Sequence, residues 1–173
     1  QIGRGYDLST WVEKTALEMA DAVVAVSSST RDDILRLFDV DPAKVPVIAN
    51  GIDTDEYKPT RDASVFARYG IDPDKPYVLF VGRMTRQKGL LYLLQAIPQL
   101  NAGTQVVLCA GDSDTPELQK ELEAIIAKLK VHRPGIVWIA EMVSRPTTIA
   151  LYTQAAVFCC PSIYEPFGII NLE

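Results

Sequence analysis

Residues 82–89 combine three positive charges with glycines, directly after the apolar run 77–81. The charges are those of Arg83, Arg86 and Lys88, of which Arg83 and Lys88 are the candidates for the site. Arginine offers a planar fork to two phosphate oxygens and lysine adds a point charge, while Gly82 lets a ligand come close to the backbone. The spacing matches neither a P-loop nor a G-x-G-x-x-G turn. We interpret it as a diphosphate site that needs no metal ion, rather than as a solvated loop.

A second segment places Glu165 and Glu173 on either side of a glycine turn at Gly168, after the apolar run 157–160. A strand followed by a glycine turn and a helix start favours an anion or a sugar, because a helix N-terminus carries unpaired N–H groups and a partial positive charge. Taken alone, Glu165 also fits a helix-start acid that only satisfies the local dipole, and Glu173 fits a solvent-facing residue of a first turn.

The rest of the pattern predicts the elements that position these segments. Short β-branched or aromatic runs predict buried strands over 23–26, 45–48, 77–81, 106–109, 136–139 and 157–160. Helices are expected over 12–20, 32–38, 90–100, 117–130, 145–154 and from Asn171 onward, with Ser9 capping the first, Ser29 or Thr30 the second and Thr115 the fourth. This alternation predicts an α/β fold, a Rossmann-like parallel sheet with helices on both faces. Ligands of such sheets bind beyond the carboxyl ends of the strands.

A change in composition between Asp53 and Pro76, rich in proline and aspartate, predicts a linker or domain edge. The two strands expected before it are too few for an independent sheet. Residues 1–58 are therefore interpreted as the tail of a preceding domain with its linker, and residues 59–173 as most of a Rossmann-like domain that is truncated at its carboxyl end.

Composition excludes several classes of function. Hydrophobic residues make up 48% and charged residues 23%, which are ordinary values for a folded soluble domain. The net charge of −5 gives no general attraction to nucleic acid, and no apolar run reaches the roughly 18 residues of a membrane span. We expect a cytoplasmic protein with no nucleic-acid partner and no transmembrane segment. The three cysteines lack metal-site spacing and are expected to be free thiols.

The sequence also contains a candidate metal-binding motif. Asp112 and Asp114 have the D-x-D spacing of metal-dependent sugar transferases, in which carboxylates hold a divalent ion against a diphosphate. The same spacing recurs at 39–41 and 53–55, so a capping or turn role before Thr115 is favoured.

Five segments together resemble retaining glycosyltransferases of the two-Rossmann-domain (GT-B) type, in the glycogen synthase-like, family 4-like group. They are Gly82-Arg83-x-x-x-x-Lys88-Gly89, Glu165-Pro-Phe-Gly-Ile-Ile-Asn-Leu-Glu173, and residues 20–27, 47–53 and 161–165, in the order found in that family. The resemblance implies that residues 1–58 end the amino-terminal acceptor domain and that residues 59–173 form the nucleotide-sugar-binding domain.

The resemblance also implies roles for the catalytic residues. Arg83 and Lys88 would bind the diphosphate and neutralise the leaving group as the glycosidic bond breaks. Glu165 would face the transferred sugar. Retention by same-face attack needs no covalent carboxylate nucleophile, and no cofactor or metal is expected beyond the nucleotide sugar itself.

The remaining site residues would bind substrate. Glu173 would hold the ribose hydroxyls, because a carboxylate accepts two hydrogen bonds. The backbone near Gly168 and Ile169 would lie by the sugar and phosphates, and Gly82 would allow the ligand to approach. The base is expected against residues 140–143, at Met142 and Val143.

The implied reaction moves glucose from a nucleotide sugar, best ADP-glucose, to an α-1,4-glucan or a small glucosyl acceptor, as in glycogen biosynthesis. Three alternatives stay open: a UDP- or GDP-sugar transferase with a lipid or small-molecule acceptor, a non-catalytic nucleotide-sugar-binding module, and a sugar-nucleotide epimerase. The glycine-rich loop of the amino-terminal domain and the helices after Glu173 are not in the sequence, so the chain alone is expected to have little transfer activity.

Overall fold

The computed structural model describes the backbone of residues 3–173 and the side chains from residue 7 onward. The chain forms two compact units. The first, here called the amino-terminal unit, comprises the residues up to Ile52 together with Glu165–Leu172; the second, the sheet unit, comprises Asp53–Tyr164 and Glu173.

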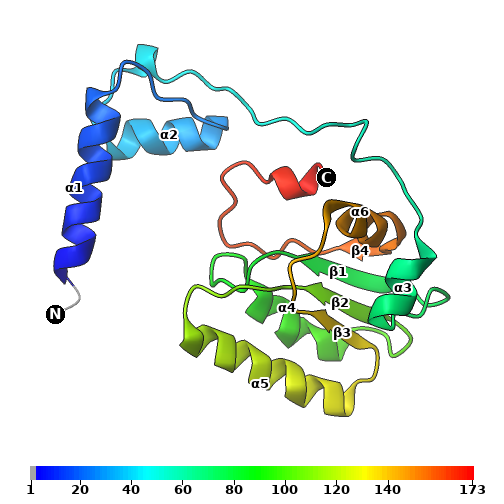
Figure 1. Ribbon diagram of the computed structural model, residues 1–173. Coiled ribbons are helices and arrows are strands. Elements are labelled where there is room, and N and C mark those ends of the chain that lie inside the picture. Colours follow the sequence, from blue (N-terminus) through cyan, green and yellow to red (C-terminus); the bar gives the residue numbers. More distant parts are fainter. Residues whose placement is uncertain (1–2) are drawn as a thin grey trace. The chain divides into compact units, whose positions relative to one another are not determined.

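The sheet unit is built around four parallel strands. They are β1 (Tyr77–Val81), β2 (Gln105–Cys109), β3 (Ile136–Ile139) and β4 (Val157–Phe158). Their order is β3-β2-β1-β4, and every neighbouring pair runs parallel. Because parallel neighbours need long crossovers, a helix follows each of the first three strands (Figure 1). The predicted Rossmann-like α/β fold is confirmed.

Helices cover both faces of the sheet (Figure 1). They are α3 (Ala63–Tyr69) and α6 (Arg145–Gln154) on one face, and α4 (Leu90–Ala96) and α5 (Pro116–His132) on the other. Side chains of a strand alternate between faces, so Phe80 and Leu108 pack with α4 and α5 while Leu79 and Val107 pack with α3 and α6. Among the described residues, no helix combines the length and the apolar character needed to cross a bilayer.

Most helix boundaries of the sheet unit follow from local sequence. Thr115 caps α5 as predicted, with its hydroxyl accepting a hydrogen bond from the Leu118 N–H, and α6 has the predicted bounds. The helix expected over 90–100 is shorter, because α4 ends at Ala96 and a 3-10 turn, Ile97–Gln99, contains a proline. Helix α3 was not predicted, although Asp62 at its N-cap and a glycine at its C-cap are ordinary boundary residues.

The amino-terminal unit contains α1 (Gly3–Met19), α2 (Ser28–Leu37) and the 3-10 turns Pro42–Lys44 and Ile169–Asn171. Two predicted caps are wrong here: α1 begins before Ser9, and α2 is capped by Ser27 rather than by Ser29 or Thr30. A 3-10 turn, Ile169–Asn171, stands where a helix is expected to begin, and the helix itself stays a prediction.

The predicted strands over 23–26 and 45–48 are not formed. The structure has one isolated parallel bridge, between Ala25 and Val47. Ala25 is fully buried, whereas Val24 and Ile48 are 54% and 56% exposed. Apolar character suggested strands, but a strand also needs neighbours to continue its hydrogen bonding, and the described part of this unit supplies only this bridge.

Gln105, at the start of β2, is buried and ties the α3–β1 connection to the sheet. Its Oε1 accepts from the Asp72 N–H at 2.9 Å, and its Nε2 donates to the Asp72 carbonyl at 2.8 Å and the Lys75 carbonyl at 3.3 Å. Gln105→Leu keeps the volume but removes all three bonds, so we expect a loss of about 1–3 kcal/mol of unfolding free energy. The measurement is equilibrium urea unfolding. The exposed Gln119→Leu on α5 is the control, expected within about 0.5 kcal/mol of the parent, and equal losses in both variants would refute the prediction.

Candidate active site

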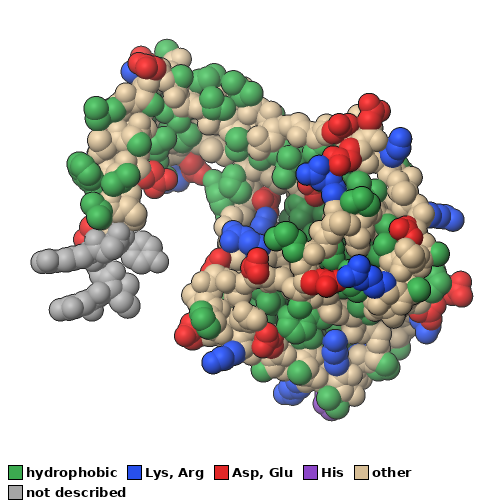
Figure 2. Space-filling view, in the orientation of Figure 1, with side chains coloured by type: hydrophobic (Ala, Val, Ile, Leu, Met, Phe, Trp, Pro, Cys, Tyr) green, Lys and Arg blue, Asp and Glu red, His purple; other side chains and the backbone are tan. Residues whose placement is uncertain are grey.

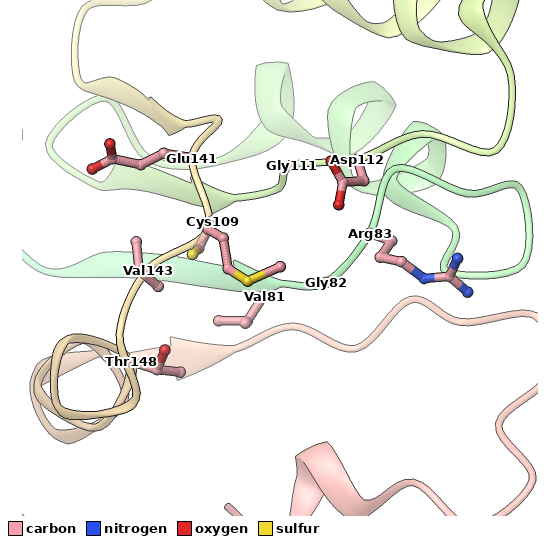
Figure 3. A pocket seen from close by; sticks show the side chains of 10 residues that line it. Val81, Gly82, Arg83, Cys109, Gly111, Asp112, Glu141, Val143 and Thr148 are labelled. Atoms are coloured by element: carbon pink, nitrogen blue, oxygen red, sulfur yellow. The ribbon is translucent and has the colours of Figure 1, made fainter.

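A cleft of about 250 Å³ opens at the carboxyl ends of β1, β2 and β3, where parallel sheets bind ligands. Its lining comes from the segments that leave these strands and from α6. The residues are Val81, Gly82, Arg83, Cys109, Gly111, Asp112, Glu141, Met142, Val143 and Thr148. Figure 3 shows Arg83 at one end of this cleft and Glu141 at the other, with Val81 and Cys109 between them. We call it the carboxyl-edge cleft.

Residues 82–89, here called the basic loop, are held against the segment that follows β2. The Met84 N–H donates to the Asp112 carbonyl at 2.9 Å, and the Ser113 hydroxyl donates to the Met84 carbonyl at 3.0 Å. The Met84 side chain is buried between the sheet and α4. The backbone on either side of Arg83 is therefore held, since the Gly82 N–H also donates to the Cys109 carbonyl at 3.0 Å.

The second half of the basic loop is ordered by Thr85 and Gln87. The buried Thr85 hydroxyl accepts from the Lys88 N–H at 3.1 Å, which fixes the turn that carries Lys88. The Gln87 carbonyl accepts from the Ile163 N–H at 2.8 Å, and the Gln87 side chain donates to the Tyr164 carbonyl at 2.9 Å. The segment after β4 is thus attached directly to the basic loop.

Arg83 forms an ion pair with Asp114 at 3.5 Å, and both side chains are more than half exposed. Exposed pairs of this kind contribute little, about 0–1 kcal/mol, so a diphosphate can replace the carboxylate at low cost. Of the capping or turn role favoured for Asp112 and Asp114, the capping part is wrong, because Thr115 caps α5. Asp112 instead lines the carboxyl-edge cleft.

The far end of the cleft is shaped by Glu141, which the sequence analysis had not singled out. Its Oε1 accepts from the Arg68 guanidinium and from the Tyr69 hydroxyl, both at 2.8 Å. Figure 3 shows the carboxylate turned away from Arg83. Burial and the nearby Glu141 raise the pKa of the Cys109 thiol to about 11, so at neutral pH the thiol is uncharged and lines the cleft as an apolar group.

The predicted base-binding residues lie at this end. Met142 is 91% exposed and Val143 is half-buried, and both line the cleft. The apolar lining suits the flat face of a base, since ligand pockets are mainly apolar with a few polar groups. The structure thus brings Gly82, Arg83, Met142 and Val143 to one cleft.

Glu173 contacts two tyrosines of its own unit. Its carboxylate accepts from the Tyr57 hydroxyl at 3.2 Å and from the Tyr152 hydroxyl at 3.3 Å. The Tyr152 ring packs edge-on against Phe158, with 5.4 Å between ring centroids. Burial first, and then the Glu173 charge, raise the pKa of Tyr152 above its ordinary value, so its hydroxyl stays protonated and able to donate. Tyr57, Tyr152 and Glu173 line a separate cleft of about 290 Å³.

Glu165, Gly168 and Ile169 lie in the amino-terminal unit. Gly168 has a φ of 76° and precedes the 3-10 turn Ile169–Asn171. A Cβ on Gly168 would lie 3.2 Å from the Glu165 Cγ and 2.7 Å from the Asn171 amide nitrogen, so the turn packs tightly around this glycine. The convergence of Glu165 with Arg83 and Lys88 stays a prediction.

Two family models together match nearly the whole chain. A family model described as Glycosyltransferase Family 4 matches residues 2–56, and one described as Glycosyl transferases group 1 matches residues 62–173. The chain belongs to the glycosyl transferases group 1 family. The resemblance to GT-B glycosyltransferases of the family 4-like group is confirmed, and the carboxyl-edge cleft lies within the group 1 match.

Individual relatives agree with this assignment. The chain is 47% identical to α-maltose-1-phosphate synthase of Mycobacterium tuberculosis, over 100% of its own length and 46% of that protein. Sucrose-phosphate synthase from Thermosynechococcus elongatus has a similar structure, with a TM-score of 0.77 and 25% identity over 95% of this chain and 40% of that one. The glycosyltransferase WaaG has the same fold, with a TM-score of 0.78 at 19% identity over 99% of this chain and 46% of that one. The chain therefore spans less than half the length of these relatives.

Proposed function

We propose that the protein containing this chain is a retaining hexosyltransferase that moves glucose from ADP-glucose to a small glucosyl acceptor or to an α-1,4-glucan. The observation that carries the proposal is the position of Arg83 at one end of a cleft whose other end offers the apolar Met142 and Val143 beside Glu141. Such a cleft offers a cation to a diphosphate and an apolar surface to a base.

Each site residue has a role that its charge, hydrogen-bonding capacity or apolar character allows. Arg83 and Lys88 stabilise the negative charge that grows on the departing diphosphate as the bond to the sugar breaks. The base lies against Met142 and Val143, and Glu173 accepts hydrogen bonds from the ribose hydroxyls. Glu165 faces the transferred sugar from the turn that ends at Gly168.

The product of one relative favours a particular class of acceptor. The name of the 47%-identical protein denotes a product, α-maltose 1-phosphate, that consists of two glucose units and one phosphate. Glucose 1-phosphate is the acceptor that would give this product in one transfer. We therefore favour a small glucosyl phosphate over a long glucan. A cytoplasmic location and independence of metal ions remain predictions of the sequence.

The experiment uses the full-length protein with ADP-, UDP- and GDP-glucose as donors. Glucose 1-phosphate and maltooligosaccharides serve as acceptors, with and without EDTA. We expect transfer from ADP-glucose, a product linkage that NMR identifies as α, and no effect of EDTA. Transfer from UDP- or GDP-glucose alone would overturn the donor, and a β linkage would overturn retention. Nucleotide binding without transfer to any acceptor would leave the non-catalytic module as the function.

A further inference from the structure

The hydroxyl of Ser27 hydrogen-bonds with the Ser29 and Thr30 hydroxyls, the Thr30 N–H and the Pro166 carbonyl, and the last two bonds have different consequences. As the N-cap of α2 it accepts from the Thr30 N–H at 3.1 Å, which is an ordinary capping contact. The same oxygen donates to the Pro166 carbonyl at 2.7 Å, 139 residues further along the chain. The Thr30 hydroxyl lies 3.3 Å from the same carbonyl. All of these atoms belong to the amino-terminal unit.

The Pro166 carbonyl belongs to the residue that directly follows Glu165, so a bond to it restrains the backbone of the turn that carries Glu165. The proline ring fixes φ of Pro166, so holding its carbonyl also fixes ψ at that residue. A Cβ added at Gly168 would lie 3.2 Å from the Glu165 Cγ, so the glycine leaves the Glu165 stem room to lie against this turn. The Ser27 bond therefore holds the backbone immediately after Glu165 in the position that the turn requires.

We propose that Ser27, assisted by Thr30, is a positioning residue for Glu165: its hydroxyl holds the Pro166 carbonyl and thereby orients the carboxylate at the reacting sugar. The inference rests on the proposed function, since it matters for catalysis only if Glu165 faces the transferred glucose. Ser27 itself does not touch substrate. Its effect should appear in turnover rather than in donor binding.

The two roles of Ser27 can be separated by chemistry. A hydroxyl both accepts and donates, whereas an aspartate carboxylate only accepts. Ser27→Asp therefore keeps the cap on α2 and loses the bond to Pro166. Ser27→Gly loses the hydroxyl at little cost to the cap, because glycine is itself a tolerated N-cap residue. Ser27→Thr keeps both bonds, and Ser29→Ala removes an exposed neighbouring hydroxyl that bonds to Ser27 but not to Pro166.

The variants are made in the full-length protein and measured for kcat, donor Kd by calorimetry, and melting temperature. Because small displacements of a catalytic group can cost about 100-fold in rate, we expect kcat to fall roughly 10- to 100-fold in Ser27→Asp and Ser27→Gly. Donor Kd should change less than about 3-fold, a shift of only about 0.6 kcal/mol. Melting temperatures should stay near that of the parent, and Ser27→Thr and Ser29→Ala should keep parental kcat.

Parental kcat in Ser27→Asp and Ser27→Gly would overturn the inference. So would a loss of turnover in Ser27→Thr, or a fall in kcat that follows a fall in melting temperature, since either would indicate a merely structural role. If Ser27→Asp does not fold, Ser27→Gly carries the same comparison. Failure of the proposed function looks different, because the parent protein would then transfer no glucose from any donor tested.

Discussion

Replacing Gly89 with alanine is expected to destabilise the protein by about 2–5 kcal/mol, combining about 1–2 kcal/mol for a left-handed backbone with about 1–3 kcal/mol for overpacking. Gly89 is buried at the N-cap of α4 with a φ of 67°. A Cβ there would lie 2.0 Å from the Pro161 carbonyl oxygen and 2.8 Å from its carbon. No rotation of a side chain relieves such a contact, because the obstructing atoms are backbone.

The measurement is equilibrium urea unfolding of the parent and of Gly89→Ala. Gly70→Ala is a matched control, because Gly70 has the same φ of 67° but nothing within 4 Å of the added carbon. The control should lose only the backbone cost of about 1–2 kcal/mol, so the difference between the variants measures the contact with Pro161. Equal losses would show that the close approach to Pro161 has no energetic consequence.

Arg83→Ala is expected to weaken binding of ADP-glucose and of free ADP roughly 10- to 100-fold, because hydrogen bonds to charged groups contribute about 1.5–3 kcal/mol. Arg83 is the cation of the carboxyl-edge cleft, and its backbone is held by the bonds of Met84 to the segment after β2. Arg83→Lys should recover only part of the affinity, since lysine cannot form the two parallel bonds of a guanidinium. Calorimetric titration of the full-length protein measures each affinity.

Arg86→Ala is the matched control, because Arg86 lies on the same basic loop but lines a different cleft. The loss of nucleotide affinity in Arg86→Ala should stay below about 3-fold, because salt screens the interaction of a distant exposed charge with the ligand. Asp114→Asn removes the carboxylate that pairs with Arg83 and should leave affinity unchanged or slightly improved. Equal losses of affinity in Arg83→Ala and Arg86→Ala would show that Arg83 contributes only through its charge. Unchanged affinity in both variants would show that Arg83 does not bind the nucleotide.

The sequence by itself determined the class of fold and the place of the site. Runs such as 77–81 and 106–109 are apolar at every position, which is what a strand covered on both faces requires, and β1 and β2 occupy them. Local boundary residues were informative only in part: Thr115 caps α5 as predicted and bonds within its own first turn, whereas the caps expected at Ser9 and at Ser29 or Thr30 are wrong. Apolar strand runs and helix caps both depend on residues that are close in the chain. The carboxyl edge of the sheet, and with it Gly82 and Arg83, could therefore be located from the sequence.

Only the tertiary structure decided which distant groups meet. It showed that Glu141 is held by Arg68 and Tyr69, that Glu173 accepts from Tyr57 and Tyr152, and that the Ser27 hydroxyl holds the Pro166 carbonyl. It also showed that residues 23–26 and 45–48 meet in a single bridge rather than in a sheet. Periodicity and composition record how each segment meets its immediate surroundings, whereas these contacts join side chains and carbonyls 21 to 139 residues apart, whose meeting depends on how the whole chain folds.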